Sequence, residues 1–298
     1  MAFLHTADQM VESIKTRIRI PVSQSTYTTA KIMRIIDEEL ERHVVPKIMA
    51  CRENYFLYEE DTTVTSGTAE YKIPYRAIGG KFKTVKWVNS SSDEQKMSQI
   101  VYEDVPLFQN GDHNEPKFYI KRNSIVLVPA PSNSVEKIRW GIYLKPSSVI
   151  AVSAAAKVAS INTTSKVVTT ESTPSTITSS TKVDIVRGKG GFECLSIDQT
   201  VTVSGTSITF SSLPTDLAAG DYICLAQETP FPQIPADIHS YLTLRVCKVI
   251  LEGLGFFKEA EVLQKDLKEV ESVFDTMLTP RTEGNPKKII NRYSTLRR

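Results

Sequence analysis

The sequence predicts an α+β protein in which N- and C-terminal helices form a helical bundle, with an inserted β-rich region and an extended C-terminal tail. Three features of the 298-residue chain lead to this prediction. Apolar residues recur at helical spacing near both ends, and the middle holds short segments rich in β-branched and aromatic residues. The last residues are basic and interrupted by proline and glycine. The two amphipathic ends should pack together, because neither can bury its apolar face alone.

The composition is that of a globular protein. Hydrophobic residues make up 41% of the chain and charged residues 23%, so a sizeable core can be buried. The net charge of +2 excludes a strongly basic nucleic-acid coat protein, and any basic partner surface must be local. The N-terminus has no signal-peptide pattern, and no apolar run has the length of a membrane helix. We therefore expect a protein that is made and works in a cytosol-like compartment, unless it leaves inside a larger assembly, with no membrane partner.

The N-terminal helices of the bundle are expected within residues 1–54. A short helix over residues 10–19 precedes a longer one, for which Ser25 or Thr26 can serve as N-cap. Pro46 should kink the longer helix, because proline lacks the backbone N–H and crowds the carbonyl four residues back. Its apolar face comprises Ile32, Ile35, Ile36, Leu40, Val44 and Ile48.

Residues 55–150 are expected to form the β-rich insertion. Their apolar segments are short and bounded by Gly, Pro, Asn and Ser. The sequence KRNS, residues 121–124, is typical of a hairpin turn in which Asn123 adopts the left-handed conformation.

Residues 151–232 are expected to form a second small β-module. Ser or Thr occupies 15 of the 29 positions from 153 to 181, a composition that a flexible linker would also have. Apolar β-branched residues recur through this stretch, and threonine favours strands, so the β-module is the preferred interpretation.

Residues 233–279 should return to helix and complete the bundle. Pro235 suits a first helical turn, and Gly253 and Gly255 mark the end of that helix. The last helix has the most regular pattern in the chain, with apolar residues alternately four and three positions apart. Such a seam needs another helix against it. Its members are Phe256, Ala260, Leu263, Leu267, Val270, Phe274 and Met277.

The stretch IPYRAIGGK, residues 73–81, looks at first like a phosphate-binding loop. Such loops point the N–H groups of a following helix at the anion, and no helix follows here. We instead expect Ile73 and Tyr75 to face the core and Gly79-Gly80 to form a turn. Arg76 should bond to backbone carbonyls or to an acidic residue across a subunit boundary. Arg76, Gly79 and Gly80 are therefore candidate subunit-interface or structural residues.

The basic tail, residues 280–298, combines six basic residues with the single acidic residue Glu283. Pro280, Gly284 and Pro286 oppose helix formation. A disordered basic tail is one interpretation. The interleaved apolar residues favour another, a segment that orders on docking into a partner. The candidate docking residues are Arg281, Lys287, Lys288, Ile289, Ile290, Arg292, Tyr293, Leu296, Arg297 and Arg298.

The sequence contains no catalytic signature and no metal-ligand spacing. GxSxG, GxxxxGK[ST], GxGxxG and HExxH are all missing, and the four cysteines form no CxxC pair. We therefore expect no enzyme activity, no catalytic residues, no cofactor and no metal.

Four segments resemble a known family. They are IPYRAIGGK, SIVLVPAP (residues 124–131), AGDYICLAQETPFPQIP (residues 219–235) and PRTEGNPKKIINRY (residues 280–293). Their content and order are similar to those of the head-to-tail adaptor, or connector, proteins of tailed bacteriophages with short tails. The resemblance covers most of the chain.

The resemblance implies a virion structural protein at the head–tail junction. Such adaptors form a ring, usually of twelve copies, that docks under the portal and lines the channel through which genomic DNA passes. Their C-terminal extension grips the portal protein, and a downstream tail or nozzle protein binds below. Two alternatives stay open: a nucleic-acid-binding module acting through the basic tail, and a tail or receptor-binding protein that uses the Ser/Thr-rich module.

Overall fold

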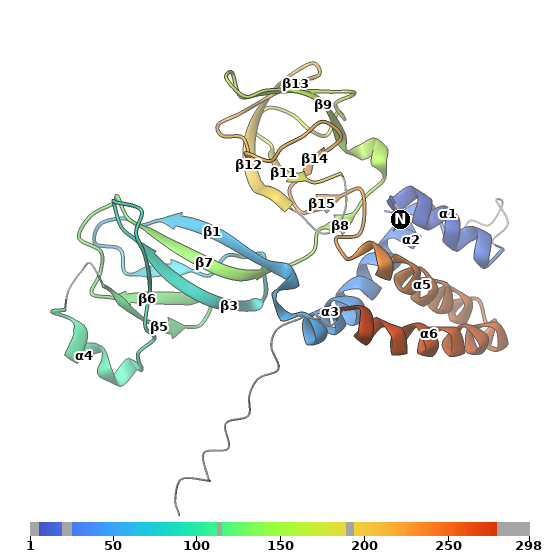
Figure 1. Cartoon of the computed structure of the whole chain (residues 1–298), viewed down its shortest axis with the longest axis horizontal. Helices are drawn as coiled ribbons and strands as arrows, with labels where there is room; N and C mark the ends of the chain where they lie inside the picture. The colour runs from blue at the N-terminus through green and yellow to red at the C-terminus, as the bar shows by residue number, and fades with distance from the viewer. Residues whose placement is uncertain (1–5, 20–25, 112–114, 189–193, 279–298) are drawn as a thin grey trace, which may run out of the picture.

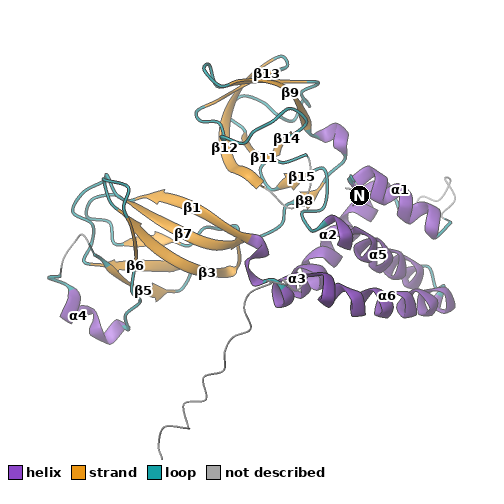
Figure 2. Ribbon diagram, viewed as in Figure 1, coloured by secondary structure: helices purple, strands orange, loops and turns teal. Residues whose placement is uncertain are grey.

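The computed structural model describes residues 6–19, 26–111, 115–188 and 194–278 (Figure 1). The prediction of a helical bundle built from the terminal helices is wrong as a description of this fold. Strands make up 32% of the chain, and they include a closed six-stranded barrel and several further sheets. The fold is therefore a strand-rich mixed α/β structure (Figure 2). The β regions build hydrophobic cores of their own, so they are not appendages of a helical core.

Helices from both ends of the chain share one hydrophobic core, in which Ile36, Leu242 and Leu267 are buried. Helices α5 and α6 lie side by side in this region, next to α1 and α2 (Figure 1). The break expected near Pro46 is a single π-helical turn, Leu40–Val44, between α2 and α3. The N-cap of α2 is Thr28, two residues after the predicted Thr26. The helices are α1 Ala7–Arg17, α2 Thr29–Glu39, α3 Val45–Cys51, α5 His239–Gly253 and α6 Phe257–Leu278.

Two sheets pack around a second core that contains Trp87, Trp140 and Phe118. One sheet has the strand order β1-β7-β3-β4 and the other β2-β6-β5, with antiparallel pairing throughout. The short helix α4, Val105–Phe108, lies at the far end of this unit (Figure 1). The strands are β1 Leu57–Thr63, β2 Glu70–Lys72, β3 Ala77–Val88, β4 Glu94–Lys96, β5 Lys117–Lys121, β6 Ser124–Val128 and β7 Lys137–Leu144.

The third core fills a closed barrel with the strand order β10-β13-β12-β11-β14-β9. The Ser/Thr-rich stretch supplies β9 and β10, so it is not a linker. Alternate side chains of β10 point inward, where Val168 is fully buried. The barrel strands are β9 Ala156–Asn162, β10 Val167–Thr170, β11 Lys182–Val186, β12 Cys194–Ser204, β13 Ser207–Phe210 and β14 Tyr222–Leu225.

A short parallel pair joins the three units. Strands β8, Ser148–Val149, and β15, Glu228–Thr229, lie between the barrel and the helices (Figure 1). The carboxylate of Asp37 in α2 accepts a 2.8 Å hydrogen bond from the backbone N–H of Val149 in β8. The chain therefore enters and leaves the barrel beside the helical core.

Candidate functional site

Arg76 lies in the turn between β2 and β3, where it is buried with only 3% of its surface exposed. Its Nη1 donates to Oδ2 of Asp184 in β11 at 2.7 Å, and its Nη2 donates to Oγ of Ser147 at 3.0 Å. Asp184 itself is 0% exposed. One guanidinium thus ties the two-sheet unit to the barrel and to the connection that leads into β8.

The Asp184 carboxylate accepts further hydrogen bonds from the backbone N–H groups of Asp198 and Gln227, each at 2.9 Å. Burial raises the pKa of Asp184, and the charge of Arg76 works against that rise. Burial alone would lower the pKa of the Arg76 guanidinium. The negative charge of the Asp184 carboxylate raises that pKa by more, so the pKa of Arg76 lies above its usual value. Nearby, the Tyr75 hydroxyl donates to the Asp198 carboxylate at 2.8 Å.

This junction is built to hold parts of the chain together. A reactive pair needs access for a substrate, and neither charged group of the Arg76–Asp184 pair is accessible. In the described ranges, no group of three or more His, Cys, Asp and Glu side chains stands close enough to hold a metal ion. The arrangement thus supports a mechanical role at the boundary between two modules.

The structure places the residues of the 73–81 stretch in different surroundings. Ile73 packs against the two-sheet core, but Tyr75 is 65% exposed, so the expectation that it faces the core is wrong. The acidic partner of Arg76 lies in the same chain. Gly79 and Gly80 lie within β3 with φ of +60° and +64°, at a bulge where the β3–β7 register shifts, and not in a turn between strands.

Two separate groups of exposed apolar side chains stand out on the surface. One lies at the start of α6, where Phe256 is 51% exposed and Phe257 is 68% exposed. The other lies at the segment around α4, where Leu107 is 77% exposed. We call them the α6 patch (Phe256 and Phe257) and the α4 patch (Val101, Tyr102 and Leu107).

The helical pattern of the last helix could have revealed the α6 patch. Phe257 falls outside the apolar seam, so its side chain does not face the neighbouring helix. The seam itself is largely inside, since Ala260, Leu267 and Phe274 are buried, although Phe256 is half exposed. The α4 patch has no comparable signal, because its helix has only four residues.

The ten candidate docking residues of the basic tail, from Arg281 to Arg298, lie outside the described residues. Comparison of the sequence with protein-family models and with curated proteins gives no match. Among the helices that the structure describes, none is long and apolar enough to cross a membrane.

Proposed function

We propose that this chain is a structural, non-enzymatic subunit of a bacteriophage virion, a head-to-tail adaptor. It forms a ring under the portal protein, connects the capsid to the tail and surrounds the DNA exit channel. The proposal adopts the function implied by the resemblance of the four sequence segments. It rests on one structural observation, the presence of two distinct apolar patches on one chain.

Helix α4 and the start of α6, which carry the two patches, lie far apart in the molecule (Figure 1). Exposed apolar groups favour protein contacts, because burial of each removes apolar surface from water. A ring needs a heterologous contact, in which one face of a subunit meets a different face of the next. Two separate patches on one chain satisfy that requirement, whereas a two-fold dimer would need only one.

The basic tail supplies the proposed link to the portal. Its apolar residues serve as anchors, and its charges pair with carboxylates of the portal or with nearby DNA. Repetition of a weak contact around a ring multiplies its effect, so no single tail needs high affinity. Below the ring, a downstream tail or nozzle protein completes the connection.

Co-expression with the portal protein of the same phage genome tests the proposal. We expect a ring complex by light scattering and negative-stain electron microscopy, with the isolated chain a monomer. Deletion of residues 285–298 should leave a folded chain that no longer docks on the portal. The double substitution Phe256→Ser/Phe257→Ser should abolish ring closure, since it removes both members of the α6 patch.

The matched control is Val135→Ser, at an equally exposed valine outside both patches. It should leave ring formation intact. Rings that form equally well with the patch variant would contradict the role of the α6 patch. Unimpaired docking of the truncated chain would contradict the role of the tail. Salt-dependent DNA binding by the isolated chain, lost on truncation, would favour a nucleic-acid-binding module instead.

A further inference from the structure

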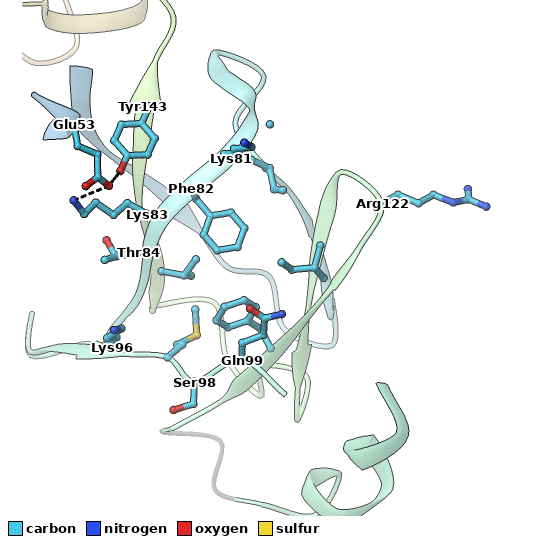
Figure 3. A pocket seen from close by; sticks show the side chains of 16 residues that line it. Glu53, Lys81, Phe82, Lys83, Thr84, Lys96, Ser98, Gln99, Arg122 and Tyr143 are labelled. Atoms are coloured by element: carbon cyan, nitrogen blue, oxygen red, sulfur yellow. Dashed lines mark hydrogen bonds and ion pairs between the residues drawn. The ribbon is translucent and has the colours of Figure 1, made fainter. Parts of the chain in front are cut away.

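A cleft of about 880 Å³ lies between the two sheets of the two-sheet unit, strands β1 to β7 (Figure 3). We call it the β3 cleft. One wall is β3, and the other is the last residue of β4 and the segment after it, residues 96–99. Its floor is one face of β5, since Phe118 and Ile120 line it two residues apart.

The edge of β3 lines this cleft. Six consecutive residues, 80–85, contribute to the wall. Successive side chains of a strand point to opposite faces, so a cavity on one face would meet only every second residue. A cavity that meets all six must run along the edge of the strand, where backbone N–H and C=O groups point outward.

That edge has no strand partner among the described residues. Strand β4 pairs only with residues 86–88 of β3, and one more bond follows, from the Met97 N–H to the Val85 carbonyl at 3.0 Å. After Met97 the chain turns away from β3 and forms hydrogen bonds with β5. There the Phe118 N–H donates to the Ser98 carbonyl at 3.1 Å, and the Ile100 N–H donates to the Phe118 carbonyl at 2.8 Å. Both walls are thus held in place while the edge over residues 80–84 stays open.

The charges around the cleft are mostly positive. Four basic side chains line it, against the single carboxylate of Glu53, which pairs with Lys83 at 3.2 Å and also accepts from the Tyr143 hydroxyl (Figure 3). The remaining basic groups, Lys81, Lys96 and Arg122, are exposed and form no ion pair within the described part of the chain, and the side chain of Arg122 points away from the cleft (Figure 3). The cleft therefore combines a basic rim, an apolar floor and an open strand edge.

We propose that the β3 cleft binds an extended acidic segment of a partner protein, which adds to the edge of β3 as a strand. The open backbone groups would supply hydrogen bonds, Phe118 and Ile120 would receive apolar side chains, and the basic rim would select acidic residues. The open stretch, residues 80–84, has room for a strand of at most about five residues, or roughly 17 Å, and the β3–β7 register shifts within it. This inference stands apart from the proposed adaptor function and does not depend on it.

Two other occupants fit less well. A nucleic-acid strand offers phosphate oxygens, which accept hydrogen bonds but cannot donate to the carbonyls of a strand edge. The chain's own tail carries six basic residues against one acidic residue, so the basic rim would repel it. A peptide backbone offers both donors and acceptors, and acidic side chains complement Lys81 and Lys96.

The test measures binding of labelled probes to the full chain by fluorescence polarisation. The first probe is a twelve-residue peptide of alternating valine and glutamate. The second is the same peptide N-methylated at alternate residues, which keeps its charge and blocks the backbone bonds. The third is a twelve-nucleotide single strand of thymidylate. We expect binding of the first probe only.

Exposed lysines supply the matched variants. Lys81→Glu/Lys96→Glu should weaken binding of the first peptide about tenfold or more, because it reverses two charges at the rim. Lys258→Glu, at an exposed site on α6, should leave it unchanged. Circular dichroism would verify that the variants are folded. Equal binding of the methylated peptide, preference for the oligonucleotide, no binding of the first peptide, or an equal loss with Lys258→Glu would each overturn the proposal.

Discussion

Replacement of Arg76 by methionine tests whether the buried pair holds the two β units together. Methionine keeps an unbranched side chain about as long as the aliphatic part of arginine and removes the guanidinium. Asp184 would then stay fully buried and keep only the N–H groups of Asp198 and Gln227, while Ser147 would lose its donor. Removal of one partner of a buried ion pair costs about 3–5 kcal/mol, because the remaining charge is left uncompensated.

A second substitution, at Asp184, separates the cost of leaving a buried charge unpaired from the cost of losing the hydrogen bonds of Arg76. Arg76→Met/Asp184→Asn removes both charges and keeps a side-chain oxygen that can still accept a backbone hydrogen bond. The double variant should therefore be more stable than Arg76→Met alone, by about 1–3 kcal/mol.

Urea unfolding measured by tryptophan fluorescence gives the free energies, since Trp87 and Trp140 lie in the core of the two-sheet unit. Limited proteolysis would follow the connections between that unit and the barrel. A loss below about 1 kcal/mol for Arg76→Met would refute the reasoning. A double variant whose loss equals the sum of the two single losses would also refute it, because the residues would then not be coupled.

Three further predictions each concern the surroundings or the backbone conformation of individual residues. Burial raises the pKa of Asp37 from 3.8 to about 6, so the folded state holds this proton more tightly than the unfolded state. Its stabilisation, up to about 3 kcal/mol, is present below about pH 4 and lost as the pH rises through 6. Denaturation at pH 4 and 7.5 should show Asp37→Asn more stable than the parent only at the higher pH; an equal gain at both would contradict this. Gly79→Ala and Gly80→Ala should each cost about 1–2 kcal/mol through their positive φ, although no atom lies within 4 Å of the added Cβ, and unchanged unfolding midpoints would contradict that strain. Leu267→Ala should cost about 2–5 kcal/mol, whereas Val262→Ala on the exposed side of the same helix should change stability by less than about 0.5 kcal/mol; similar losses in urea would refute the assignment of the buried face.

Local pattern was enough to place several elements of this fold. The periodicity near both ends corresponds to α2, α5 and α6, and the KRNS segment does connect two antiparallel strands. In that turn, however, the residue with positive φ is Arg122 and not Asn123. Propensity alone therefore located the turn but assigned the left-handed position to the wrong residue.

The fold class could not be obtained in the same way. Alternation of apolar residues indicates that a segment is a strand but not which strand it pairs with. Closure of the barrel depends on the pairing of β9 with β14, for example Ala156 with Ile223, and these residues are far apart in the chain. The number of separate cores therefore does not follow from the sequence pattern, and the helical periodicity at the ends does not reveal that the strands build cores of their own.

The candidate site shows the same limit. The composition of the 73–81 stretch draws attention to Arg76, but its partner Asp184 lies 108 positions away. Nothing near Asp184 in the sequence marks it as buried. The β3 cleft depends on where β4 stops pairing with β3, which is a property of the folded chain.

The shared core of the terminal helices has a consequence for biosynthesis. The apolar faces of α1, α2 and α3 are made first, but α5 begins roughly 190 residues after α3 ends, so at translation rates of about 5–20 residues per second they wait for on the order of 10–40 s. Both β units can close during that interval, because their cores use residues made before α5. On the ribosome, the unfinished helical core is thus the surface that needs protection by a chaperone.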